Sequence, residues 1–267
     1  LLCMTALTLP FAAADTSNSA WRKVGVDPDL WVDGPEPEDT PMQFTYQGNA
    51  IVEIEVSYVP AHLSSRSYGV ITLELFEQWA PITTNNMILN VENGIYDGIF
   101  FHRVIDDFVI QGGDPTCSRV GLYPLTSPQC GSGGTGDTIP LELNPNLSHV
   151  DGAIGMARSQ DPDSADAQWY IAETEAHNLD PENRDDEGYA TFGIVRSGMS
   201  HVRAIALRQP QTTQPVTSKF RIPHPLQAVQ PMKWKLFRFE SLAFLTLTER
   251  SDFLVPLERT PQLGSRV

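Results

Sequence analysis

Two segments in the first third of the chain alternate apolar and polar residues with a period of two. In AIVEIEVSYV (50–59), Val52, Ile54 and Val56 alternate with acidic and hydroxyl side chains, and YGVITLELF (68–76) repeats the pattern. Successive side chains of a β-strand point to opposite faces of its sheet. The alternation therefore predicts strands with one buried and one solvated face, which are stable only as parts of a larger sheet.

The other expected elements are short. A helix is predicted to begin near Pro81, a residue tolerated in the first turn, and to end at Gly94, which can adopt a left-handed conformation. Apolar residues at helical spacing over 199–205 predict a second helix that ends before Pro210. Further strands are expected at the apolar runs 99–105, 153–157, 169–172 and 191–195. We therefore expect a mainly β fold, a closed antiparallel β-barrel capped by two α-helices.

The first 47 residues differ in composition from the middle of the chain. Residues 1–14 are apolar and contain Ala12 and Ala14, the small side chains that precede a signal cleavage site. We expect them to be the remaining part of a signal peptide, and the protein to be exported to a periplasmic or extracellular compartment. Residues 15–47 are acidic and contain several prolines, which indicates an N-terminal extension that is an extended acidic linker or a loose cover, solvated chain and not a binding site.

The main domain is expected to cover residues 48–240, followed by a C-terminal extension over 241–267. Lys and Arg outnumber Asp and Glu from residue 201 onward, in contrast to the acidic front of the chain. The stretch MKWKLFRFESLAFLTL (232–247) predicts one or two strands. Such a strand would close the barrel, and a solvated extension is the alternative.

Two cysteines, Cys117 and Cys130, lie in the same polar, turn-rich segment. In an oxidising compartment they are expected to form a disulfide that closes this loop. The chain-entropy argument gives such a bridge about 3 kcal/mol of stabilisation. Two free surface thiols are the alternative.

Charge and residue spacing exclude several classes of function. A formal net charge of −15 argues against a nucleic-acid partner, which requires clustered Lys and Arg. No apolar run has the roughly 18–20 residues that span a bilayer, so no stable membrane insertion is expected. The histidines and cysteines fall at no metal-ligand spacing, and neither a nucleophile elbow nor a phosphate-binding loop is present. We therefore expect no metal and no cofactor.

In the stretch FFHRVIDDFVIQGGDPT (100–116), one His and one Arg stand together, two acids follow them, and a Gln precedes a glycine pair. It resembles the signature of the cyclophilin-type peptidyl-prolyl isomerases, especially their bacterial branch. Blocks on both sides resemble the same family in the same order, from about residue 68 to 207. They read GVITLELFEQWAPITTNNM, GAIGMARSQDPDSADAQWYIAE and GYATFGIVRSGMSHVRAI.

The resemblance implies rotation about the bond that precedes proline, with no covalent bond made or broken. The barrier is about 18–20 kcal/mol because amide resonance is lost. The site then needs an apolar slot for the proline ring and a donor for the imide nitrogen, whose lone pair returns in the transition state. The resemblance implies that Arg103 is this donor, that Phe108 forms a pocket wall and that Gln111 binds the substrate backbone. An ordinary ion pair of Arg103 with Asp106 or Asp107 is the alternative.

The resemblance also implies a set of substrate-binding residues along the groove. They are Val109, Ala157, Arg158, Ser159, Gln168, Tyr170, Asn178, Leu179 and Tyr189. Three of them depart from the family's usual residues: Val109 replaces a Met, Asn178 replaces a large aromatic residue, and Tyr170 adds a hydroxyl where a Phe is common. The first two replacements predict weaker apolar contact around the proline ring.

We expect an exported, monomeric peptidyl-prolyl cis-trans isomerase that acts on proline-containing segments of unfolded or exported proteins and assists their folding. A non-catalytic proline-peptide binding or chaperone module on the same fold is the alternative, and Asn178 and Val109 favour it. A third hypothesis treats the barrel as a scaffold whose extensions bind a partner. Turnover that disappears in Arg103→Ala, with the fold unchanged, would distinguish the enzyme from the other two.

Overall fold

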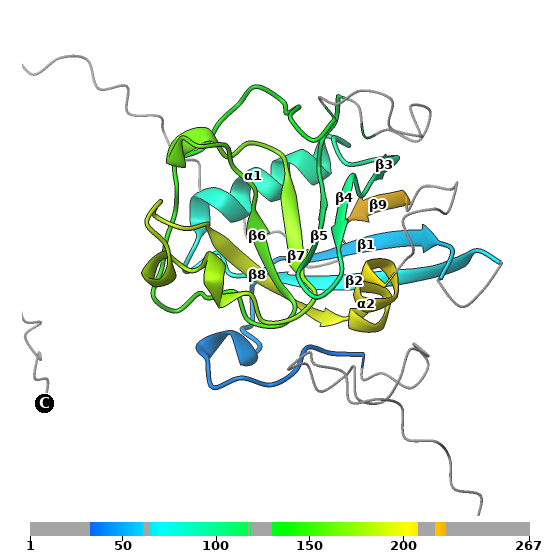
Figure 1. The fold of residues 1–267 in the computed structure, drawn as a ribbon, viewed down its shortest axis with the longest axis horizontal. Coiled ribbons are helices and arrows are strands. Elements are labelled where there is room, and N and C mark those ends of the chain that lie inside the picture. Colours follow the sequence, from blue (N-terminus) through cyan, green and yellow to red (C-terminus); the bar gives the residue numbers. More distant parts are fainter. Residues whose placement is uncertain (1–32, 61–64, 117, 119–129, 208–216, 223–267) are drawn as a thin grey trace, which may run out of the picture. The chain divides into compact units, whose positions relative to one another are not determined.

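The computed structural model describes residues 33–60, 65–116, 118, 130–207 and 217–222. Nine strands of this part form one antiparallel sheet in the order β3-β9-β1-β2-β8-β6-β7-β5-β4 (Figure 1). The strands are β1 (Ile51–Tyr58), β2 (Ser67–Leu75), β3 (Ile99–Phe100), β4 (Arg103–Ile105), β5 (Val109–Gly112), β6 (Ala153–Met156), β7 (Trp169–Ala172), β8 (Thr191–Ser197) and β9 (Thr217–Arg221). The helices are α1 (Pro81–Glu92) and α2 (Met199–Ala206), with short 3-10 turns η3 (Pro41–Gln43), η5 (Pro162–Ser164), η6 (His177–Leu179) and η7 (Pro181–Asn183).

Strands β1 and β2 follow the alternation in the sequence. Val52 pairs with Leu73 and Ile54 pairs with Ile71, and all four side chains are fully buried. The intervening Glu53 is partly exposed. Residues directly opposite each other on neighbouring strands share a face of the sheet, so these two pairs form one side of the core. The period-two pattern therefore predicted both the strands and the face that is buried.

Helix α1 begins and ends where the sequence predicts. Pro81 is its first residue, and Gly94, just past its end, has a φ of 67°. Its first backbone N–H groups have no partners within the helix. Glu142 accepts two of them, from Ile82 at 3.1 Å and from Thr83 at 2.8 Å. A carboxylate at this end also opposes the positive end of the helix dipole.

Helix α2 begins after Gly198, a residue that has no side chain to cap the helix. Asp33 of the N-terminal segment takes this role. Its carboxylate accepts the backbone N–H of Gly198 at 3.0 Å and the hydroxyl of Ser200 at 2.8 Å. The start of α2 therefore depends on a residue that lies far away in the sequence.

The described part of the acidic N-terminal extension packs against the body of the protein. Met42 is fully buried in the core, and the backbone N–H of Glu36 donates to Asp151 at 2.6 Å. Asp151 also forms a 2.6 Å ion pair with Arg203 of α2, and both side chains are buried. Residues 33–42 thus pack on the body of the protein, while the boundary between residues 47 and 48 stays a prediction.

The sheet is a curled, open half-barrel (Figure 1). β3 lies at one edge and β4 at the other, so the mainly β fold with two helices is confirmed, whereas closure of the barrel is not shown. β9, which pairs with β1 and β3, was not predicted, because its sequence TSKFR contains one large apolar residue. The strands expected at 232–247, the signal segment 1–14 and the C-terminal extension lie outside the described residues.

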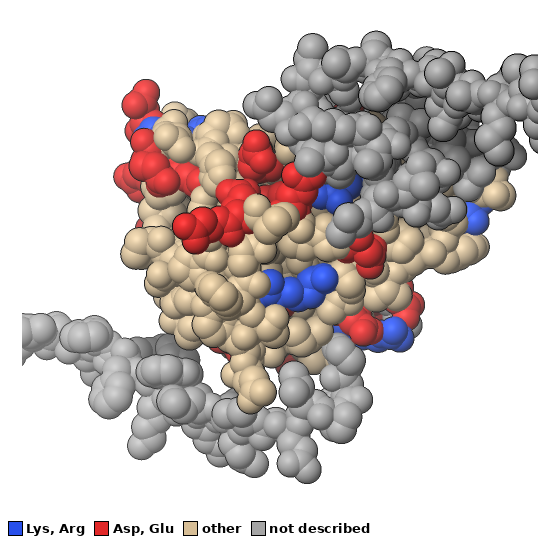
Figure 2. Space-filling view, turned by 90° about the horizontal axis from the view of Figure 1, so that it is seen from below, with Lys and Arg blue, Asp and Glu red and all other residues tan. Residues whose placement is uncertain are grey.

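Acidic side chains gather on part of the surface drawn in Figure 2, where Lys and Arg are few. This distribution agrees with the net charge of −15. In the part of the chain that the structure describes, no helix has the length and apolar character needed to cross a bilayer.

Candidate active site

Sheet register brings the predicted site residues onto one face of four neighbouring strands. Arg103 on β4 pairs with Gln111 on β5, Gln111 pairs with Tyr170 on β7, and Tyr170 pairs with Gly155 on β6. Because paired residues share a face, these residues form one row, in which Arg103 is exposed, Gln111 is partly exposed and Tyr170 is buried. The adjacent row lies in the core: Ile171 pairs with Ile110 on one side and with Ile154 on the other, and all three are fully buried.

The turn between β4 and β5 presents Arg103 and Phe108 together. Asp107 in this turn has a φ of 59°, a left-handed conformation that Asp tolerates better than most residues. Its backbone N–H donates to the buried carboxylate of Glu173 at 2.6 Å. The backbone of Glu173 donates in turn to the carbonyl of Phe108 at 2.9 Å. Glu173 therefore fixes the turn, and the Arg103 guanidinium lies 6.0 Å from the centre of the Phe108 ring.

A chain of side-chain hydrogen bonds holds the exposed Arg103 guanidinium. Arg103 donates to the Gln111 side-chain oxygen at 3.2 Å, and the Gln111 amide donates to Gln168 at 3.0 Å. Gln168 donates to the carbonyl groups of Gly131 at 2.7 Å and Gly133 at 2.8 Å. Among the described residues, this hydrogen bond of Arg103 goes to Gln111 and not to Asp106 or Asp107. The guanidinium lies beside Phe108 and Gln111, as its predicted role requires.

Two carboxylates that the sequence analysis missed support the glycine-rich loop GSGGTGD (131–137), whose carbonyls bind Gln168. Asp114 accepts the backbone N–H groups of Gly131 at 2.7 Å and Gly133 at 3.2 Å. Asp166 accepts those of Thr135 at 3.0 Å and Gly136 at 2.7 Å. For Asp114, the sequence offered one signal, because this acid directly follows the glycine pair in QGGD (111–114). These bonds keep the loop carbonyls where Gln168 can reach them.

Two of the predicted substrate-binding residues, Arg158 and Tyr189, contact each other beyond the end of β6. The Arg158 guanidinium lies 4.7 Å from the centre of the Tyr189 ring and donates to the carbonyls of Gly188 and Ser159, each at 2.9 Å. The backbone N–H of Ala157 donates to Gln168 at 2.9 Å, which joins the end of β6 to the start of β7. Ser159 is exposed, whereas Ala157 and Tyr189 are half-buried.

The three other predicted pocket residues differ in their exposure. Val109 lies on the same face as Gln111 but is 1% exposed, and Leu179 is 8% exposed. Asn178 on η6 is exposed, and its backbone carbonyl accepts a hydrogen bond from Arg184 at 3.4 Å. The position where an aromatic wall was expected thus carries a small amide at the surface. The binding roles of all three stay predictions.

A sequence model of one family, "Cyclophilin type peptidyl-prolyl cis-trans isomerase/CLD", matches residues 58–224, which is more than half of the chain. This chain belongs to the cyclophilin-type peptidyl-prolyl isomerases. Its enzyme class is therefore peptidyl-prolyl cis-trans isomerase, as the sequence blocks predicted.

Curated relatives from bacteria and a fungus support the assignment. A peptidyl-prolyl cis-trans isomerase of Acinetobacter baylyi is 37% identical over 52% of this chain and 67% of its own length. Isomerase ppi1 of Schizosaccharomyces pombe is 34% identical over 56% of this chain and 88% of its own length. Isomerase A of Dickeya dadantii is 32% identical over 64% of this chain and 84% of its own length.

A solved structure supports the fold. The cyclophilin-type isomerase of Cryptosporidium parvum matches with a TM-score of 0.52 and 22% identity, over 66% of this chain and 99% of its own. At this level of identity the likeness concerns the fold alone.

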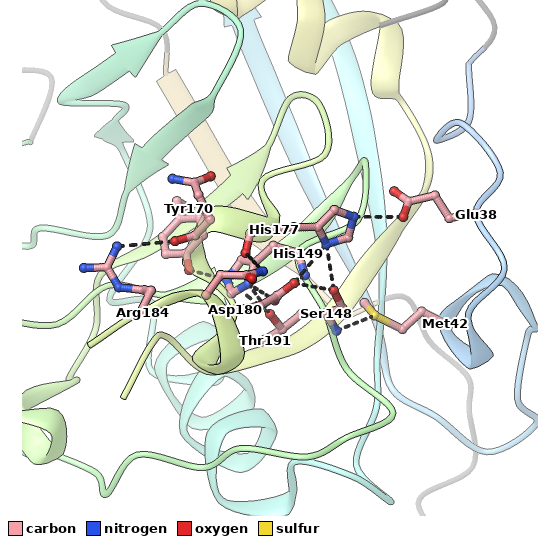
Figure 3. Close-up of polar contacts among 11 residues, drawn as sticks. Glu38, Met42, Ser148, His149, Tyr170, His177, Asp180, Arg184 and Thr191 are labelled. Atoms are coloured by element: carbon pink, nitrogen blue, oxygen red, sulfur yellow. Dashed lines mark hydrogen bonds and ion pairs between the residues drawn. The ribbon is translucent and has the colours of Figure 1, made fainter. Parts of the chain in front are cut away.

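A second polar network of this cyclophilin-type chain lies behind the predicted pocket residue Tyr170 (Figure 3). The Tyr170 hydroxyl lies 2.6 Å from Nε2 of His149, and Nδ1 of His149 lies 2.6 Å from the carboxylate of Asp180. The other oxygen of Asp180 contacts His177 at 2.9 Å, and His177 contacts Glu38 at 3.1 Å. The sequence analysis missed His149 and Asp180 because no motif joins residues 31 positions apart.

Two pKa shifts in this network have clear causes. Burial alone would raise the pKa of Asp180, but hydrogen bonds from His149, Ser148 and His177 outweigh it and lower the pKa to about 2. Burial raises the pKa of the Tyr170 phenol well above its usual value, and neighbouring Tyr189 and Asp180 add to this effect. At neutral pH the carboxylate is therefore ionised and the phenol is protonated.

A pocket of about 440 Å³ opens beside this network and shares Tyr189 with the predicted site. Its walls include Leu143, Leu147 and Pro181, and Asp180 and Thr191 also line it. Among the residues that the structure describes, no group of three or more His, Cys, Asp or Glu side chains could hold a metal ion.

The predicted disulfide stays a prediction. Cys130 is disulfide-bonded, and Cys117, its expected partner, lies outside the described residues.

Proposed function

We propose that this enzyme isomerises X–Pro bonds in exported proteins and thereby assists their folding, with Arg103 as the group that stabilises the twisted amide. The observation that carries the proposal is the placement of the guanidinium. Arg103 is held by Gln111 at 3.2 Å and lies beside Phe108 on the exposed face of the sheet. A substrate proline that rests against Phe108 would then have a fixed donor next to its ring nitrogen.

The chemistry needs a donor that binds the transition state more tightly than the ground state. In a planar prolyl amide the nitrogen lone pair is delocalised, so the nitrogen is a poor acceptor. The lone pair returns as the bond twists, and a hydrogen bond to it then lowers the barrier. Arginine suits this role because its guanidinium stays charged and its planar fork lets Gln111 hold one N–H group while others remain available.

One charged hydrogen bond supplies only part of the acceleration. Such a bond contributes about 1.5–3 kcal/mol, whereas a 10⁵-fold acceleration requires about 7 kcal/mol. Preorganisation supplies the remainder in this proposal, because the chain from Gln111 through Gln168 to the glycine-rich loop holds the guanidinium before the substrate arrives.

The decisive experiment measures cis-trans exchange of an Ala-Pro peptide by NMR with the wild type and with Arg103→Ala. We expect the wild type to accelerate exchange, and the substitution to lower kcat/KM by about 10- to 150-fold, the equivalent of one charged hydrogen bond. Arg221→Ala serves as the matched control. It removes an exposed arginine that pairs with Glu53 and Glu55 of β1, and it should leave turnover unchanged.

Two outcomes would contradict the proposal. Equal turnover in the wild type and Arg103→Ala would show that the guanidinium is not the donor. Peptide binding by the wild type without any exchange would favour the non-catalytic binding module. The exposed Asn178, in place of an aromatic wall, is the observation that favours this second candidate.

The proposal of export rests on two features. Residues 1–14 have the composition of a secretory signal, and Cys130 is disulfide-bonded, a state that an oxidising compartment maintains. When the gene is expressed in a bacterium, we expect the mature protein in the extracytoplasmic fraction with Asp15 as its first residue. Reduction should raise its mass by two hydrogens. Unprocessed protein with two free thiols in the cytoplasm would contradict export.

A further inference from the structure

We propose that His149, oriented by Asp180, binds the hydroxyl of Tyr170 so that the wall of the proline pocket stays apolar although it carries a tyrosine. The inference rests on the proposed function, because it assigns Tyr170 to the wall of the same pocket. It makes His149 a positioning residue, which acts on the substrate only through the phenol.

The position of Tyr170 supports this assignment. Its strand neighbour Gln111 lies on the same face of the sheet and binds Arg103, so the Tyr170 ring belongs to the face that carries the predicted site. Tyr170 is 4% exposed, and its ring meets the Tyr189 ring edge to face, with centroids 6.2 Å apart. A phenol buried this deeply must place its hydroxyl proton on an acceptor, because a buried polar group without a partner is costly.

Asp180 determines which nitrogen of His149 can act as that acceptor. The ionised Asp180 carboxylate can only accept, and it takes the backbone N–H of His149 at 2.9 Å and contacts Nδ1 at 2.6 Å. Nδ1 must therefore carry the proton. With that proton on Nδ1, Nε2 is the nitrogen left to accept, and in this proposal the Tyr170 O–H, 2.6 Å away, donates to it. The hydroxyl proton thus points to the imidazole instead of to the pocket.

A glycine on the neighbouring strand provides the space that the Tyr170 phenol occupies. Gly155 faces Tyr170 on the neighbouring strand, and a Cβ at Gly155 would lie 2.5 Å from the phenol carbon and oxygen. The imidazole also lies roughly parallel to the Tyr170 ring, with centroids 5.8 Å apart, and Nε2 lies 3.2 Å from the hydroxyl of Thr191. The imidazole and the glycine thus pack directly against the phenol that the proposal assigns to the pocket wall.

If His149 acts only by binding the Tyr170 hydroxyl, removing the imidazole alone should weaken peptide binding. Removing the imidazole and the hydroxyl together should leave peptide binding nearly unchanged. His149→Leu leaves the buried phenol without its acceptor, so we expect the Kd for an Ala-Pro peptide, from an NMR titration, to rise by about tenfold. Tyr170→Phe should bind within about twofold of the wild type. The double substitution His149→Leu/Tyr170→Phe should restore binding to within about threefold of the wild type.

Two further variants test whether the effect is specific. His149→Gln keeps an amide oxygen that can accept from the phenol, so it should bind better than His149→Leu. Tyr58→Phe is the matched control. Its hydroxyl also contacts a histidine, His201 at 2.9 Å, but on β1, away from the predicted site. We expect this substitution to leave peptide binding unchanged.

The rescue decides the inference. The inference is overturned if the double substitution weakens peptide binding by the product of the two single effects, or if it fails to fold. Either result would show that His149 supports the structure independently of the hydroxyl. If His149→Leu alone does not fold, recovery of folding and binding in the double substitution still supports it. Because the measurement is peptide binding, a wild type that binds without turnover would refute the proposed function and still permit this test.

Discussion

Gly155 is a residue at which a single methyl group should disturb the predicted site. A Cβ there would lie 2.5 Å from the ring and hydroxyl of Tyr170, closer than such contacts occur. We predict that Gly155→Ala displaces the phenol from His149, lowers the free energy of unfolding by about 1–3 kcal/mol and weakens binding of an Ala-Pro peptide. Chemical denaturation and the peptide titration measure the two effects.

Gly34→Ala is the matched control for this substitution. The nearest atom to a Cβ at Gly34, the carbonyl oxygen of Arg196, is 4.0 Å away, which is an ordinary contact. Both variants add the same methyl group, so a loss confined to Gly155→Ala would identify the cause as its collision with Tyr170. Equal stability and binding in the two variants would contradict the prediction.

Helix α2 shows how an element can depend on a distant segment. Gly198 at its start has no side chain, so Asp33 supplies the cap through the backbone of Gly198 and the hydroxyl of Ser200. We predict that Asp33→Ala lowers the free energy of unfolding by about 0.5–2 kcal/mol, as the loss of a helix cap does. Urea denaturation of the full chain measures this loss.

Asp39→Ala is the control for the cap. Asp39 is an exposed acid of the same segment, and its loss changes the net charge by the same amount. We expect its stability to match the wild type within about 0.5 kcal/mol. A similar loss in both variants would mean that the charge of the segment, and not the cap, stabilises the fold.

At the scale of the whole molecule, the N-terminal segment is joined to the predicted site through His177. Burial alone would lower the pKa of His177, but the hydrogen bond with Asp180 and the charge of Glu38 outweigh it and raise the pKa. A histidine with a raised pKa in the folded state stabilises the fold most below about pH 6.5, its unfolded value. This stabilisation is lost as the pH rises through the higher folded pKa.

We therefore predict that the contact between Glu38 and His177 stabilises the protein more at pH 5.5 than at pH 8.5. Because the His177 side chain is 43% exposed, solvent screens the pair and the effect on Tm is expected not to exceed about 2–4 °C. The measurement compares the wild type with Glu38→Gln at both pH values. A Tm difference between them that is larger at pH 8.5 would contradict the prediction.

The sequence by itself determined the parts of the protein that depend on neighbours along the chain. Alternation fixed β1 and β2 and their buried faces, because a strand repeats every two residues. The spacing of Arg103, Phe108 and Gln111 falls within one hairpin, so the sequence motif was sufficient to predict that they lie together. Helix α1 was likewise predicted from its terminal Pro81 and Gly94.

Only the tertiary structure decided the contacts between distant segments. Sheet register places Gln168 and Tyr170 beside the hairpin, and packing places His149 against Asp180, Asp33 at the start of α2, and β9 beside β1. None of these pairings produces a repeating pattern in the sequence. The local sequence around each partner would be equally compatible with other long-range contacts. A long-range contact is selected by the free energy of the whole packed core, which no short stretch of sequence contains.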